Sequence, residues 1–125
     1  MTLEELDRWL DTYGRAWENR DVDGFLDCFT PGAEYWWGPS WDEPLCGHDA
    51  IRARTEQAVS AQENVLFGHE VLAITPDGRG MARWWVSFDV PGEKIDLEGI
   101  FVVTLDGDGK CTDFREWWNA RSRPA

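Results

Sequence analysis

Apolar residues recur at helical spacing near the start of the chain, at Leu3, Leu6, Leu10, Tyr13 and Trp17. Intervals of three and four residues place them on one side of a helix, which we expect to run to about Asn19. Thr2 and Glu5 match the capping-box pattern that satisfies the first free amides of a helix. The chain is therefore predicted to open with an amphipathic helix.

Shorter elements follow up to about residue 62. Asp21 can cap a second helix that presents Phe25, Leu26 and Phe29 to the core, and Pro31-Gly32 would end it. Residues 33–37 are expected to form a short strand, and residues 38–47, with two prolines, a loop. A third helix is predicted over about residues 48–62. One side of this helix would carry Ile51, Thr55, Ala58, Val59 and Gln62.

The second half of the chain has the pattern of β-strands. Four runs, at 65–75, 81–90, 94–105 and 111–119, are separated by short turns rich in glycine, proline and aspartate. Turns this short connect antiparallel neighbours. The sequence predicts one α+β domain over residues 1–125, with three N-terminal helices and a mainly antiparallel sheet.

Alternation in the last strand singles out one carboxyl group. Successive side chains of a strand point to opposite faces, so Phe114, Glu116 and Trp118 share one face. If that face looks into a closed interior, burial would raise the pKa of Glu116 into the range useful for proton transfer. If it looks outward, Glu116 is an ordinary solvated residue.

Charge and cysteine content restrict the function. The chain has 24 acidic and 12 basic residues and a formal net charge of -12, which disfavours nucleic acid and anionic membranes as partners. We expect no signal peptide, because the N-terminal segment has the pattern of an acidic amphipathic helix, and no apolar run approaches the roughly 20 residues that span a bilayer. Three cysteines without paired spacing suit reduced thiols in a cytoplasm. We expect no cofactor, and no metal site from two isolated histidines.

Tryptophan is the abnormal part of the composition. Nine tryptophans in 125 residues are more than a small core needs, since each large aromatic residue buries about 150–250 Å². The additional tryptophans could line a ligand cavity or form an aromatic subunit interface.

Three short segments carry a resemblance to a known family. They are residues 21–25 (DVDGF), residues 47–51 (GHDAI) and Gly109-Lys110 before the last strand. With this order of elements, the chain resembles the SnoaL-like polyketide cyclases and ketosteroid isomerases of the nuclear transport factor 2-like superfamily. The resemblance implies a cone-shaped α+β barrel, in which helices cover a strongly curved sheet around a cavity. Members include isomerases, cyclases, dehydratases and noncatalytic binders, so fold alone does not fix the activity.

The isomerase pattern is largely lost. Its oxyanion-donor tyrosine falls on Tyr13, but its general-base aspartate falls on Trp37 and its protonated aspartate on Phe101. A chain without that base should not isomerise steroids. In the cyclase pattern, the acid/base aspartate falls on Glu116 and a histidine on Phe114. Glu116 and Tyr13 are therefore the candidate catalytic residues.

The same alignment predicts which residues contact a ligand and which form an interface. The ligand-contact candidates are Trp17, Trp37, His69, Trp84, Phe88, Phe101, Phe114 and Trp118. For His69 a structural hydrogen-bonded role is the competing interpretation. The opposite sheet face would expose a second set, through which relatives commonly dimerise: Trp85, Ile100, Val102, Arg115 and Trp117. A homodimer through this outer face is predicted.

Two functional hypotheses follow. The first is a domain that binds a small apolar or aromatic ligand and moves a proton without a cofactor, with Glu116 as acid or base and Tyr13 as oxyanion donor. The second is a noncatalytic ligand-binding or dimerisation module. A cavity above about 300 Å³ with Glu116 at its wall would favour the first. A cavity filled by Trp37, Trp84, Phe101 and Trp118 would favour the second.

Overall fold

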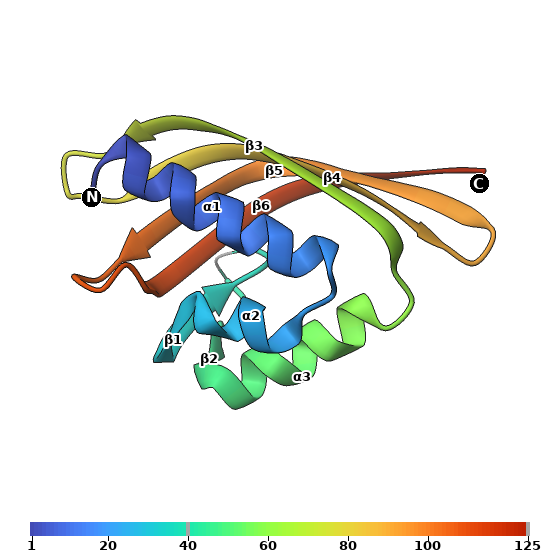
Figure 1. Ribbon diagram of the computed structural model, residues 1–125, viewed down its shortest axis with the longest axis horizontal. Coiled ribbons are helices and arrows are strands. Elements are labelled where there is room, and N and C mark those ends of the chain that lie inside the picture. Colours follow the sequence, from blue (N-terminus) through green and yellow to red (C-terminus); the bar gives the residue numbers. More distant parts are fainter. Residues whose placement is uncertain (40, 125) are drawn as a thin grey trace.

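The computed structural model describes residues 1–39 and 41–124. Its helices are α1 (Leu3–Glu18), α2 (Val22–Asp27) and α3 (Gly47–Val59) (Figure 1). Its strands are β1 (Phe29–Trp36), β2 (Leu45–Cys46), β3 (Glu63–Ile74), β4 (Gly80–Val90), β5 (Glu93–Leu105) and β6 (Cys111–Pro124). The α+β class and the order of helices and meander strands are confirmed.

One six-stranded sheet holds the fold together. Its strand order is β2-β1-β6-β5-β4-β3, with β3 to β6 forming the predicted antiparallel meander. β1 returns to pair with β6 in parallel, and β2 adds an antiparallel edge. The sheet curves strongly but stays open, because β2 and β3 are its two edges. Figure 1 shows it arching over α1, with α2 and α3 below.

The first helix forms for the reasons that its sequence predicts. Thr2 and Glu5 complete a capping box, in which the amide of Glu5 donates to Thr2 Oγ1 at 3.1 Å and the amide of Thr2 donates to Glu5 Oε1 at 3.3 Å. The buried side of α1 includes Leu6, Leu10 and Tyr13. This side packs on the sheet, above all on β3.

Several boundaries differ from the prediction, and β6 runs to Pro124, five residues beyond the predicted end, because it stays paired with β5 as far as Glu93. Phe29 begins β1 and does not end a helix, because it pairs with Cys111 of β6, and a register shift after it accommodates Pro31-Gly32. β2 lies within the predicted loop, of which residue 40 is outside the described residues. The third helix ends at Val59, three residues early, and Gln62 binds the side chains of other elements.

The inner face of the sheet and the helices enclose a cluster of packed aromatic rings. Along β4, Trp84, Val86 and Phe88 are buried whereas Trp85 is exposed, as period-two alternation requires. Phe101 lies 4.7 Å from Trp84, centroid to centroid, in a near-parallel stack, and 4.6 Å from Phe114. Ring pairs at such distances add stabilisation beyond the area that they bury.

The outer face of the sheet carries the predicted exposed aromatics. Trp85 and Trp117 are 38% and 46% exposed, and the Arg83 guanidinium lies 4.5 Å from the centre of the Trp85 ring. Ile100 is paired with Trp117 across β5 and β6, and Val102 with Arg115. These residues form one contiguous outer patch.

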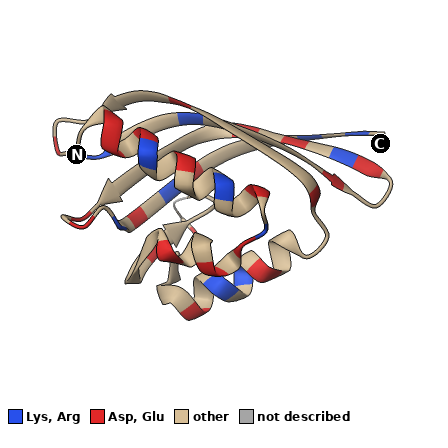
Figure 2. Ribbon diagram, viewed as in Figure 1, with Lys and Arg blue, Asp and Glu red and all other residues tan. Residues whose placement is uncertain are grey.

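Acidic residues are spread over the surface. Figure 2 shows them on all three helices and at the β5–β6 turn, with basic residues interspersed. In the described part of the chain, no helix is long and apolar enough to cross a membrane.

Candidate functional site

A cavity of about 290 Å³ lies between the inner face of the sheet and the three helices. Trp17 from α1, Trp37 after β1, and Trp84 and Trp118 from the sheet contribute large rings to its wall. Glu116 of β6, Tyr13 of α1, Tyr35 of β1 and Arg54 of α3 contribute polar groups. The cavity therefore combines an aromatic wall with a few polar groups, as small-molecule sites commonly do.

A glycine shapes the sheet side of this cavity. Gly99 of β5 is paired with Trp84 on one side and with Trp118 on the other. A Cβ atom there would lie only 1.7 Å from the carbonyl oxygen of Trp117. The absent side chain thus permits a close backbone approach between two cavity-lining tryptophans.

Glu116 is a buried carboxyl group. It is 8% exposed and pairs across the sheet with Phe101, while its neighbour Trp117 is exposed on the other face. Burial raises the pKa of Glu116 from 4.5 to about 8, against the opposing effects of a hydrogen bond from Tyr35 and the charge of Arg54. At pH 7 about nine-tenths of these carboxyl groups are therefore protonated.

Two tyrosines connect α1 and β1 to this carboxyl group. The Tyr35 hydroxyl donates to Glu116 Oε2 at 3.4 Å, and the Tyr13 and Tyr35 hydroxyl oxygens are 3.5 Å apart. Both rings are buried, and burial together with the charge of Glu116 raises the pKa of both phenols well above the usual value. Both remain neutral donors, and Tyr35 is the one in direct contact with the acid.

Arg54 and Arg20 are the cations that line the cavity, and Arg54 is the one in contact with an aromatic ring. Its guanidinium carbon lies 3.6 Å from the centre of the Trp37 ring, a distance at which a cation is attracted to the aromatic face. Its Nε is buried without a hydrogen-bond partner, and so is Nε1 of Trp84. Within residues 1–39 and 41–124, no carboxylate forms an ion pair with Arg54.

Other polar atoms of the wall already have partners. Trp17 Nε1 donates to Gln62 Oε1 at 2.8 Å, and Arg20 donates to the Gln62 carbonyl oxygen at 3.0 Å. Trp118 Nε1 donates to the Trp37 carbonyl oxygen at 3.1 Å. These bonds fix the orientation of the rings and leave Arg54 and Trp84 as the unsatisfied donors.

Seven predicted residues lie together around the cavity: Tyr13, Trp17, Trp37, Trp84, Phe88, Glu116 and Trp118. Phe101 and Phe114 are both fully buried and do not line it. Both side chains point to the inner face of the sheet, as predicted, but pack within the ring cluster. Phe101 stacks on Trp84, and Phe114 stacks on Tyr35 with the ring centres 4.7 Å apart. They support the wall from behind.

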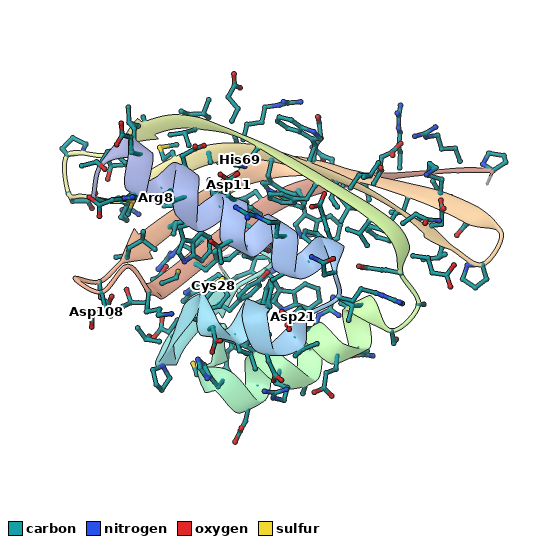
Figure 3. All side chains as sticks on the ribbon, in the orientation of Figure 1. Arg8, Asp11, Asp21, Cys28, His69 and Asp108 are labelled. Carbon is teal, nitrogen blue, oxygen red and sulfur yellow. The ribbon has the colours of Figure 1, made fainter. Side chains whose placement is uncertain are left out.

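His69 lies outside the cavity, between β3 and α1. Its Nε2 is 2.7 Å from Asp7 Oδ1, and its Nδ1 is 4.0 Å from Asp11 Oδ1. Figure 3 shows His69 beside Asp11 of α1. Because α1 covers β3, the inner face of this edge strand meets the helix and not the cavity. The geometry is that of the structural role considered for His69.

Two site residues were missed by sequence reasoning. Tyr35 is two residues before Trp37, and alternation could have placed it on the same face. Arg54 is three residues after Ile51, the buried residue of α3, and helical spacing could have placed it toward the interior. In the described residues, no cluster of three or more His, Cys, Asp or Glu side chains could hold a metal ion.

Comparisons with known proteins agree with this architecture. RV0760c from Mycobacterium tuberculosis superposes with a TM-score of 0.81 at 16% identity, covering 98% of this chain and 99% of that one. The Δ5-3-ketosteroid isomerase from Mycobacterium sp. gives 0.78 at 14% identity, covering 95% and 98%. SalBIII, an epoxide hydrolase/cyclase-like enzyme in pyran ring formation of the polyether salinomycin, gives 0.75 at 21% identity, covering 94% and 95%.

These structural likenesses show a shared fold. No curated protein sequence matches the chain. A model of the SnoaL-like domain matches residues 7–114, which is most of the chain. The protein belongs to the SnoaL-like domain family.

Proposed function

We propose that this domain binds a small apolar or aromatic molecule in its cavity and that Glu116 moves a proton on that molecule without a cofactor. The observation that supports this proposal is a carboxyl group that lines the cavity, is 8% exposed and has a pKa raised to about 8. An acid or base works best when its pKa is near the working pH. A carboxylate with a purely structural role would not be expected to line an apolar cavity without a cationic partner.

The proposed step is an isomerase-type proton transfer. The ionised Glu116 takes a proton from a carbon beside a carbonyl group, and the protonated Glu116 returns it to another carbon or to oxygen, so composition is conserved. The Tyr13–Tyr35 pair donates the hydrogen bond that stabilises the developing oxyanion, and Tyr35 is the nearer donor to Glu116. Trp17, Trp37, Phe88 and Trp118 hold the flat apolar part of the ligand.

Solvent hydrogen exchange tests this proposal without knowledge of the natural substrate. β-Tetralone, an enolisable aromatic ketone, is incubated with the protein in D2O, and loss of its α-proton signals is followed by NMR. Glu116→Gln should lower the protein-dependent exchange rate by about 100-fold or more, since one acid/base group contributes that much. Glu70→Gln, which removes an exposed carboxylate of β3, is the matched control. Equal rates for the parent protein and Glu116→Gln would remove the proposal.

A noncatalytic ligand-binding module is the second candidate. It is favoured by Trp37 and Phe101, which stand where the isomerases that the chain resembles carry acids. The cavity volume is close to the value of about 300 Å³ that separates the two hypotheses, so it favours neither. The proton-transfer hypothesis therefore depends on the position of Glu116 at the cavity wall. Binding of β-tetralone, measured by calorimetry, without any protein-dependent exchange would favour the module.

We also propose a homodimer through the outer patch. Trp85 and Trp117 are large exposed aromatics, and Arg115 of β6 is paired with Trp36 of β1, a composition typical of interfaces. Sedimentation velocity at micromolar concentration should give a dimer, and a Trp85→Lys/Trp117→Lys double variant should give a folded monomer. A monomeric parent protein would contradict the proposal.

A further inference from the structure

Two hydrogen-bond donors at the cavity are buried and have no partner. One is Nε of Arg54, and the other is Nε1 of Trp84, a side chain that is only 1% exposed. Leaving a buried donor unpaired is costly, and more so when it carries charge. Both residues line the cavity, so an acceptor on a bound molecule would satisfy these donors.

The charge of Arg54 selects the kind of acceptor. Its guanidinium is a planar cation whose central carbon lies 3.6 Å from the centre of the Trp37 ring. Neighbouring polar groups of the wall make hydrogen bonds with other residues and not with Arg54. Gln62 accepts hydrogen bonds from Trp17 and Arg20, and the Tyr35 hydroxyl donates to Glu116. A planar cation that is fixed in orientation and has a free edge suits the two oxygens of a carboxylate.

The rest of the wall indicates what carries that carboxylate. Trp17, Trp37 and Trp118 offer flat apolar surfaces, and a volume of about 290 Å³ is small for a ligand pocket. We propose that the ligand of this cavity is a small aromatic or polycyclic carboxylic acid whose carboxylate is bound by Arg54, with Trp84 Nε1 donating to a second oxygen. The inference rests on the proposed function, since it names the class of ligand for the same cavity.

The negative net charge of the protein makes selective binding of an anion a stringent test of the role of Arg54. A net charge of -12 repels anions in general. Preference for an anionic ligand over a neutral one of the same shape must therefore come from a local cation. Naphthoate and naphthamide form such a pair, because they differ only in the charged group.

Isothermal titration calorimetry of both compounds is the experiment. The parent protein should bind naphthoate at least tenfold more tightly than naphthamide, and Arg54→Met should lose this preference while still binding naphthamide. Arg52→Met is the matched control: Arg52 is on the same helix but pairs with Asp23 at the surface, at 2.7 Å. Arg54→Lys should keep part of the preference and guards against a folding defect in Arg54→Met.

Each outcome decides the question. Equal affinities in the parent protein, or a preference that persists in Arg54→Met, would overturn the role of Arg54 while leaving ligand binding and Glu116 chemistry untouched. Binding of neither compound would overturn the carboxylic-acid class, and the β-tetralone exchange assay would then test the proposed function by itself. The comparison in the parent protein needs no variant, so it holds even if a substitution impairs folding.

Discussion

Burial of Glu116 should make the stability of this protein fall as pH rises. The folded-state pKa of about 8 lies above the ordinary value of 4.5, so between these values the folded chain binds more protons than the unfolded chain. Unfolding becomes easier with increasing pH when the folded state holds the extra proton. The stabilisation is fully present below pH 4.5 and is lost as pH rises through about 8.

The size of the effect follows from the two pKa values. Ionising Glu116 in the folded protein costs up to about 5 kcal/mol relative to the unfolded chain, at about 1.4 kcal/mol for each pKa unit. Between pH 5.5 and 8.5 the free energy of unfolding should drop by about 3 kcal/mol through this group alone. That is a large part of the roughly 5–15 kcal/mol that stabilises a typical domain.

Glu116→Gln isolates this contribution, because glutamine has nearly the same shape and does not ionise. Urea unfolding of both proteins at pH 5.5 and 8.5 gives the difference, in which the titration of other groups cancels. The two tyrosines beside Glu116, Tyr13 and Tyr35, have pKa values raised well above the usual value and stay neutral over this range. A difference between the two proteins that is constant with pH would refute a buried, neutral Glu116.

Further predictions concern the support of this site. Tyr35→Phe removes a hydrogen bond that lowers the pKa of Glu116, so carboxyl NMR titration should give a pKa above that of the parent protein. Gly14→Ala should destabilise the fold by about 1–2 kcal/mol in urea unfolding, because the new Cβ would lie 2.4 Å from the Phe67 ring and overpacking outweighs a helix-propensity gain of about 1 kcal/mol. Gly99→Ala meets a backbone carbonyl and should be more destabilising than Gly14→Ala.

Strand faces could be predicted from the sequence because their period is local. Alternation of Trp84 and Trp85 in β4, and of Glu116 and Trp117 in β6, places one residue of each pair inside and one outside, as observed. Periodicity does not indicate how deeply a side chain is buried. Phe101 faces the interior but packs between Trp84 and Tyr13 of α1 and does not line the cavity, because the depth of a side chain depends on tertiary packing.

The remaining differences arise where one element covers another. His69 is on the inner face of β3, yet α1 crosses that strand and Asp7 meets the imidazole. The sequence gives no direct signal of where a helix crosses a sheet. Local periodicity could have placed Tyr35 and Arg54 toward the interior, but it does not show that β1 and α3, distant in sequence from Glu116, line the same cavity.

The resemblance to ketosteroid isomerases puts Trp37 where they carry a general base, and an aromatic ring there gives the site different electrostatics from a carboxylate. The Trp37 ring holds the Arg54 guanidinium, whereas an aspartate at that position would pair with Arg54 and neutralise it. Glu116, mostly protonated at pH 7, does not supply that negative charge. Under the proposed function, Glu116 would move the proton and Arg54, supported by the Trp37 ring, would bind the anionic group of the ligand.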